Sequence, residues 1–171
     1  MRALPILLAG ALALTAASCE RGAAPDKATQ AAVFKHDLPE DVSGYYIPTT
    51  AVQVGDWRLH HLFMGQVPDF MAWRNGQRAA GFAPIMMEFE AGDKTRRTRL
   101  IPTAYDVTED RVRFQATSRD LGAVSFEGRL DQDALAKARR NLGDQGVVLK
   151  GTLKVGGRTF DGVSMRWWAG D

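Results

Sequence analysis

Arg111-Val112-Arg113-Phe114-Gln115-Ala116 is the stretch that decides the fold. Apolar and polar side chains alternate along it, so one face of an extended strand would be apolar and the other polar. After a turn at Asp120-Leu121-Gly122, residues 124–130 repeat the alternation with Val124, Phe126, Gly128 and Leu130. Two such runs joined by a turn predict a pair of antiparallel strands that bury one face.

The same period of two continues through most of the chain from Ser43 onward. It occurs at residues 57–64, 85–90, 97–107, 147–155 and 158–168, with turns at Gly92-Asp93 and Gly156-Gly157. Asn75-Gly76 predicts a type I′ hairpin between residues 69–74 and 77–82, with Trp73 across from Arg78. We therefore expect a mainly β domain, an antiparallel meander of 8–9 strands. Such a meander forms a small barrel or a two-sheet sandwich, and closure into a barrel removes exposed edge strands.

One short helix is expected near residues 131–142. Asp131 is a suitable N-cap residue, and Gly143 is a suitable stop. Between them Leu135, Ala138 and Leu142 recur at helical spacing, which predicts an amphipathic helix lying against the sheet.

The N-terminus has the pattern of an export signal. Arg2 is followed by an apolar run from Pro5 to Ala17, which is too short to span a bilayer. Small residues at 16–18 precede Cys19, the only cysteine. This pattern resembles the lipobox of bacterial lipoproteins. The alternative is an ordinary secretory signal that leaves a free thiol at Cys19.

The lipoprotein resemblance implies an anchor and an address. Residues 1–18 would be the signal peptide, and Cys19 would be acylated, so that the chain is attached to the membrane through an N-terminal lipid. Glu20, in place of aspartate, favours the outer membrane facing the periplasm by resemblance to lipoprotein sorting. The small and polar composition of residues 19–42 predicts a flexible tether, and residues 43–171 a single β domain.

Charge and cysteine content exclude several function classes. The chain of 171 residues carries 22 basic and 20 acidic side chains, which gives no reason to expect a nucleic-acid partner. A single cysteine excludes an internal disulfide and any site built from several thiolates.

Gly55-Asp56-Trp57, at the head of an expected strand, resembles the Gly-x-Trp feature of lipocalins and related ligand-binding barrels. In that family an arginine packs on the tryptophan, and Arg166 is the expected partner here. The resemblance implies binding of a small apolar or amphipathic ligand. The alternating pattern gives the expected lining of an interior cavity: Trp57, Leu59, Phe63, Ile85, Met87, Phe114 and Phe126.

Phe70, Met71 and Trp73 stand next to the expected Asn-Gly turn. These residues have three possible roles: they form an apolar lip over a pocket, they form a surface for a partner, or they close the core. The sequence leaves these readings open.

A metal site is not expected, although His60-His61 with Met64, Met71, Met86 and Met87 offers ligands that suit copper. Adjacent residues of a regular strand face opposite sides of the sheet, so His60 and His61 would not share an ion. We therefore predict no metal and no cofactor.

Catalytic residues are not expected either. Gly162-Val163-Ser164-Met165-Arg166 lacks the final glycine of a nucleophile elbow. Glu88 and Glu90 are spaced as solvent-facing strand residues, and no phosphate loop is present.

Three functions from different classes remain, of which a ligand-binding envelope protein is preferred. The alternative is a protein-interaction module, an assembly accessory or inhibitor, with an exposed apolar patch of Tyr45, Tyr46, Phe70 and Trp73. An enzyme is third. A basic patch of Lys94, Arg96, Arg97, Arg99, Arg111 and Arg113 would suit an anionic partner, unless neighbouring acids neutralise it.

Overall fold

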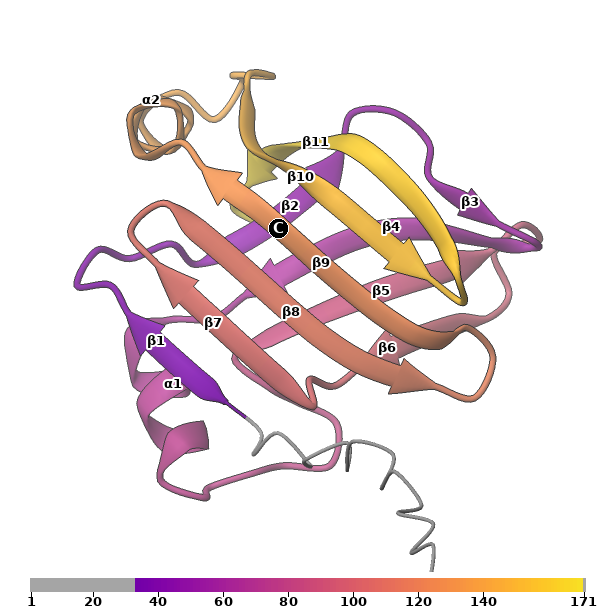
Figure 1. Cartoon of the computed structure of the whole chain (residues 1–171). Coiled ribbons are helices and arrows are strands. Elements are labelled where there is room, and N and C mark those ends of the chain that lie inside the picture. The colour runs from indigo at the N-terminus through magenta and orange to yellow at the C-terminus, as the bar shows by residue number, and fades with distance from the viewer. Residues whose placement is uncertain (1–32, 171) are drawn as a thin grey trace, which may run out of the picture. The chain divides into compact units, whose positions relative to one another are not determined.

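The fold is described for residues 33–170 in a computed structural model of the chain (Figure 1). The signal segment, Cys19 and most of the expected tether lie outside these residues. The strands are β1 (Phe34–Asp37), β2 (Gly44–Pro48), β3 (Gln53–Val54), β4 (Trp57–Met64), β5 (Ile85–Ala91), β6 (Arg97–Leu100), β7 (Ala104–Thr108), β8 (Arg111–Ser118), β9 (Gly122–Leu130), β10 (Val147–Val155) and β11 (Arg158–Trp168), and the helices are α1 (Val67–Arg74) and α2 (Gln132–Arg140). None of the helices within residues 33–170 is long and apolar enough to cross a membrane.

All the strands belong to one sheet with the order β1-β7-β8-β9-β10-β11-β2-β4-β5-β6, and β3 pairs with β4. Every pairing is antiparallel except that of β1 with β7. The predicted antiparallel, mainly β class is confirmed, and the sheet has the form of a strongly curled, open half-barrel (Figure 1). The strand count exceeds the predicted 8–9 because the short strands β1 and β3 were not foreseen and because residues 97–107 form two strands, β6 and β7.

The link between β6 and β7 requires the curl. β6 is one end of the sheet and β7 lies next to the other end, yet only residues 101–103 join them. An extended chain covers at most about 3.6 Å per residue, so the two ends of the sheet must approach each other. Pro102 lies in this link, and it lacks the N–H that a strand would need. The single strand expected over residues 97–107 is therefore two strands.

The predicted hairpin around Asn75-Gly76 is wrong, because residues 67–74 form the helix α1. Pro68 stands in the first turn, and the carboxylate of Asp69 accepts a hydrogen bond from the Gln66 N–H at 2.8 Å. Asn75 caps the C-terminus and Gly76 follows with a φ of 84°, the left-handed conformation that commonly ends a helix.

The helix predicted near 131–142 is confirmed as α2. The Asp131 carboxylate accepts a hydrogen bond from the Ala134 N–H at 2.9 Å, as an N-cap residue should. Leu135 and Ala138 are buried, but Leu142 lies beyond the helix and is 70% exposed.

The expected tether is too long by several residues, a further correction. Phe34–Asp37 forms β1 and pairs with β7, and Leu38 and Val42 are buried in the core. Burial of these side chains holds the segment to the domain, so the ordered fold begins before Ser43.

The core lies on one face of the curled sheet. β8 and β9 supply Val112, Phe114, Val124 and Phe126 to it, as the alternation predicts. β5 differs from the other strands because all its residues are buried, on both faces. The second face of β5 is therefore covered by side chains from outside the core.

Candidate functional site

A β-bulge in β4 determines the geometry of the site. Leu59 pairs with Phe89 and His61 pairs with Glu88, so that His60 is an extra residue with no partner in β5. A bulge shifts the side-chain alternation by one position. Leu59 and Leu62 are consequently both buried in the core, and His60 and His61 lie together.

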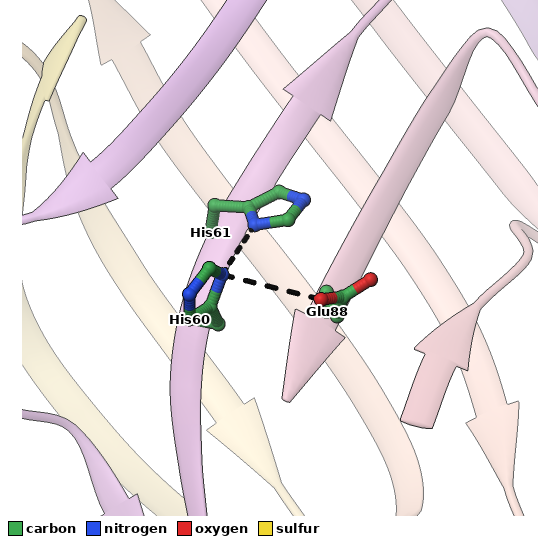
Figure 2. A group of neighbouring side chains, drawn as sticks. All are labelled: His60, His61 and Glu88. Carbon is green, nitrogen blue, oxygen red and sulfur yellow. Dashed lines mark hydrogen bonds and ion pairs between the residues drawn. The ribbon is translucent and has the colours of Figure 1, made fainter. Parts of the chain in front are cut away.

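The two imidazole rings are in direct contact. Their Nδ1 atoms lie 2.7 Å apart in a hydrogen bond whose donor depends on the tautomers (Figure 2). The expectation that neighbouring histidines face opposite sides is wrong here, because it assumed a regular strand. Strand geometry therefore does not prevent His60 and His61 from sharing a metal ion.

Glu88 completes the group from the adjacent strand β5. Its Oε1 lies 4.0 Å from the His60 Nδ1, and its side chain is only 5% exposed (Figure 2). One ligand atom from each of His60, His61 and Glu88 lies within 4.8 Å of the other two. Two imidazoles and one carboxylate form a donor set that suits zinc, copper, nickel or iron.

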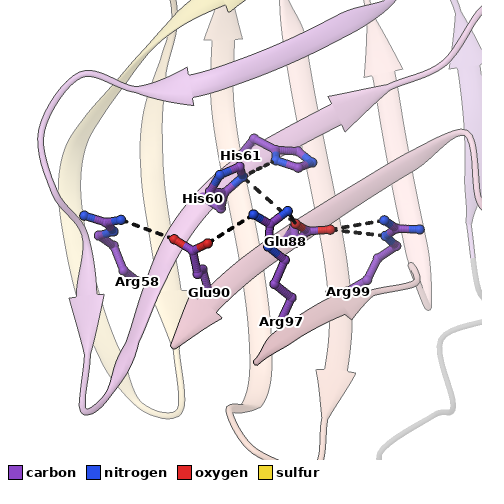
Figure 3. Close-up of polar contacts among 7 residues, drawn as sticks. All are labelled: Arg58, His60, His61, Glu88, Glu90, Arg97 and Arg99. Atoms are coloured by element: carbon purple, nitrogen blue, oxygen red, sulfur yellow. Dashed lines mark hydrogen bonds and ion pairs between the residues drawn. The ribbon is translucent and has the colours of Figure 1, made fainter. Parts of the chain in front are cut away.

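Three arginines surround the glutamates of β5 (Figure 3). Arg97 bridges them, with 3.3 Å from Nη1 to Glu88 Oε1 and 3.1 Å from Nη2 to Glu90 Oε1. Arg99 donates to Glu88 Oε2 from Nε and Nη2 at 3.4 and 3.2 Å. Arg58 reaches Glu90 Oε2 at 3.3 Å.

Glu88 and Glu90 were expected to face solvent. The expectation is wrong, since both side chains are buried. Burial acts to raise the pKa of Glu90, but hydrogen bonds from Arg97 and Arg58 outweigh it and hold that pKa below its usual value. With three guanidinium groups against two carboxylates, the cluster keeps a surplus of positive charge.

His61 is neutral at pH 7. Its pKa is lowered to about 4, chiefly by partial burial. Glu88 opposes this shift, and His60, Arg99 and Arg97 add to it. A neutral imidazole offers a lone pair to an acid or a metal ion.

The histidines open into a cleft of about 590 Å³. One part of its lining is polar and consists of His60, His61, Glu88, Arg97 and Arg99. The other part is apolar or aromatic and consists of Tyr45, Phe63, Phe82, Met86 and Trp168, with Gly170.

The aromatic side of the cleft is a connected set of rings. The Tyr45 ring lies 5.0 Å from the His61 ring and 5.4 Å from the Trp168 ring, measured between centroids. Phe63 and Phe82 are 5.9 Å apart and roughly perpendicular. Tyr45, His61 and Trp168 are far apart in the sequence, and they lie together because β2, β4 and β11 are neighbours in the sheet.

The predicted lining residues are distributed differently from the expectation. Leu59, Ile85, Met87, Phe114 and Phe126 are all buried in the packed core. Phe114 and Phe126 also touch a hollow of about 530 Å³ whose other lining residues are polar or charged. Of the seven residues named, only Phe63 lines the aromatic cleft.

Trp57 is half-buried, and its arginine partner differs from the expected one. The guanidinium of Arg96 lies 5.2 Å from the Trp57 ring centre and forms an ion pair with Asp56 at 2.8 Å. Arg166, the expected partner, lies on β11 opposite Ile47 and Val147.

Phe70 and Trp73 close the core and do not form a lip or partner surface, as they are 1% and 4% exposed. Tyr46 is also buried, so the expected exposed patch of four aromatic residues does not form. Met71 is half-exposed on α1. Arg78 does stack on Trp73, at 5.2 Å, although the two residues do not belong to a hairpin.

Comparison with protein-family models, with curated proteins and with solved structures found no match to this chain. The sequence did contain a signal for this site, in the form of histidines, acids and arginines on three consecutive strands. They are His60-His61 on β4, Glu88 and Glu90 on β5, and Arg97 and Arg99 on β6.

Proposed function

We propose that this protein is a non-catalytic binding protein of the bacterial envelope that holds a small amphipathic ligand with an anionic group in the cleft between β2, β4, β5 and β6. One observation carries the proposal: aromatic rings line the same cleft as two arginines, Arg97 and Arg99, whose guanidinium groups keep free N–H donors. The ligand site is thus on this cleft and not in an interior cavity.

The aromatic side suits the apolar part of the ligand. Phe82 is 40% exposed, and it packs edge-on to Phe63. Covering exposed apolar surface stabilises a complex by about 25 cal/mol per Å² of surface removed from water. Tyr45 and Trp168 extend the apolar surface beside His61.

The arginines suit an anionic group. The side chains of Arg97 and Arg99 are 54% and 52% exposed, although their glutamate partners are buried. Their contacts with Glu88, at 3.2–3.4 Å, are longer than the usual charge-assisted hydrogen bond of about 2.7–2.9 Å. Free N–H groups on both guanidiniums remain for a carboxylate or a phosphate.

The location follows from the N-terminal pattern. A lipid on Cys19 would hold the domain at the outer membrane facing the periplasm, where amphipathic molecules are plentiful. By this reasoning the membrane is a partner through the lipid anchor, and the cleft ligand is a second partner. The lipocalin resemblance at Gly55-Asp56-Trp57 supports the same class of function but not the same cavity.

The test uses 1-naphthyl phosphate as the anionic probe and 1-naphthol as its neutral counterpart. Isothermal titration of the purified full chain in EDTA should show one binding site for the phosphate and at least about tenfold weaker binding of the alcohol. Arg99→Ala should weaken phosphate binding. Arg129→Ala is the matched control, because Arg129 on β9 is 81% exposed and pairs with Asp110 in the turn between β7 and β8. Equal binding of both probes, or equal loss in both variants, would contradict the proposal.

A further inference from the structure

We propose that His60, His61 and Glu88 form a binding site for a divalent transition-metal ion of the zinc type. The inference is independent of the proposed ligand, because it rests on the bulge in β4 and not on the aromatic side of the cleft. The two Nδ1 atoms lie 2.7 Å apart and a Glu88 carboxylate oxygen lies 4.0 Å from the His60 Nδ1, and the pairing of β4 with β5 fixes these positions (Figure 2).

The distances are close to those of a coordinated ion. Zinc binds imidazole nitrogen and carboxylate oxygen at about 2.0–2.2 Å, which places two ligand atoms about 3 Å apart. The two Nδ1 atoms, now 2.7 Å apart, would separate slightly around the ion. Glu88 Oε1, 4.0 Å from the His60 Nδ1, would move closer by roughly 1 Å, a change within reach of side-chain rotation.

The contact between the two nitrogens is itself a reason to expect an ion. Two imidazole nitrogens in contact share one proton, which lies between them. A metal ion can take the place of this proton and bind to a lone pair of each nitrogen. Both rings would then carry their proton on Nε2 and bind as neutral ligands. No proton needs to leave the pair if both rings are neutral beforehand.

The carboxylate is held by neighbours as metal ligands commonly are. Arg97 contacts Glu88 Oε1 and Arg99 contacts Oε2, which fixes the orientation of the carboxylate (Figure 3). Each carboxylate oxygen has two lone pairs, so Oε1 can accept from Arg97 and still face the histidines.

The charge of the surroundings predicts how the site is completed. Arg58, Arg97 and Arg99 outnumber Glu88 and Glu90, so a divalent ion adds to a positive surplus. Three protein ligands also leave a coordination position open. We therefore infer that the open position faces the cleft and is taken by water or by an anion, which would offset the surplus charge.

The test is titration of the full chain with Co²⁺ and Zn²⁺ after treatment with EDTA. The chain carries no polyhistidine tag and has Cys19→Ser, so that the only thiol cannot bind the ion. We expect one ion per chain, Co²⁺ absorption bands of a low-coordinate N/O site, and displacement of Co²⁺ by Zn²⁺. His61→Ala should weaken binding by more than about 100-fold and Glu88→Gln by at least about tenfold.

His36→Gln is the matched control, since His36 is the third histidine. It lies on β1 and stacks on Phe70 of α1, away from the cleft lining. Far-UV circular dichroism of each variant checks folding. A second measurement needs no variant: long-range ¹⁵N spectra should show both Nδ1 resonances shift on adding Zn²⁺. Absence of 1:1 binding, unchanged affinity in His61→Ala, or spectra in which Zn²⁺ is bound at Nε2 while Nδ1 stays protonated would overturn the inference. These outcomes leave 1-naphthyl phosphate binding in EDTA unaffected.

Discussion

The Nδ1 atoms of His60 and His61 lie 2.7 Å apart, although regular strand geometry separates neighbouring side chains to opposite faces of a sheet. The bulge in β4 is the cause, because His60 has no partner on β5. The extra residue also keeps Leu59 and Leu62 in the core on either side of the pair. A single backbone irregularity thus creates the site and preserves the packing beneath it.

Deletion of His60 should remove the site but keep the fold. Leu59 would still pair with Phe89 and His61 with Glu88, now in a regular register. We expect a folded chain whose melting temperature changes by a few degrees at most, because no core side chain is lost, and which no longer binds Co²⁺. Thermal unfolding and Co²⁺ titration measure both. Loss of the folded state would mean that the bulge is needed for the sheet itself.

The bulge also marks the limit of what the sequence could reveal. Period-two patterning correctly predicts strands such as β8 and β9, whose core residues alternate without interruption. The same pattern read through His60-His61 gives the wrong face for one histidine, because an inserted residue leaves no signal in composition. Only Leu59 and Leu62, three positions apart and both apolar, hint at the shift.

Other differences have equally local causes. Asn75-Gly76 has the composition of a hairpin turn, yet Pro68 and Asp69 start a helix before it, and tertiary packing of Phe70 and Trp73 completes that helix. The buried Glu88 and Glu90 were not foreseen, because their burial depends on arginines from β4 and β6. Such contacts depend on which strands pair and in which register, and a single sequence does not predict either.

Arg97→Ala should destabilise the protein more than the loss of an ordinary surface arginine. Arg97 bridges Glu88 and Glu90, both buried, and its removal takes one of the two arginine partners from each carboxylate, which leaves Arg99 on Glu88 and Arg58 on Glu90. Because Arg97 itself is half-exposed and water can enter, we expect a loss of about 1–2 kcal/mol in the free energy of unfolding. Arg129→Ala, on an exposed pair, should cost less than about 0.5 kcal/mol.

Urea unfolding of the two variants provides the comparison. Adding Glu90→Gln to Arg97→Ala should recover part of the loss, since it removes one of the two buried carboxylates that have lost the Arg97 contact. Equal stability of the Arg97 and Arg129 variants would show that the arginine bridge contributes nothing to the fold.

His36 should make the protein less stable in mild acid. Burial against Phe70, 4.0 Å away between ring centres, lowers the pKa of His36 below 6.5, Arg74 lowers it further and Asp37 opposes. Between the folded pKa and 6.5 the unfolded chain binds more protons, so the free energy of unfolding falls as the pH falls through this window. Above pH 6.5 the stabilisation is fully present.

Chemical unfolding of the metal-free chain between pH 8 and pH 5 measures this dependence. His36→Gln should reduce the slope without abolishing it, because His61 also has a lowered pKa and acts in the same direction. An identical slope in the variant would show that His36 titrates alike in the folded and unfolded states.

Gly151→Ala should disrupt the pairing of β9 with β10. A Cβ atom at this position would lie 2.2 Å from the Glu127 carbonyl oxygen and 2.5 Å from the Gly128 Cα, so the two strands would have to separate. Overpacking of this kind costs about 1–3 kcal/mol. Gly81→Ala is the control, because a Cβ there meets nothing within 4 Å. Thermal melting should therefore distinguish the two variants, and similar melting temperatures would argue against so close an approach of the strands.

Phe82→Ala tests the apolar half of the cleft separately from its charges. Phe82 is 40% exposed and contacts Phe63 edge-on, so its loss should leave stability almost unchanged while removing one wall of the cleft. An aromatic contact is worth about 0.5–1.5 kcal/mol, which corresponds to roughly 2- to 12-fold weaker binding of 1-naphthyl phosphate. Met71→Ala removes a side chain that is 50% exposed on α1, outside the cleft, and should leave affinity unchanged. If both variants bind the probe as tightly as the parent, the anion is held by Arg97 and Arg99 alone, and the ligand need not be amphipathic.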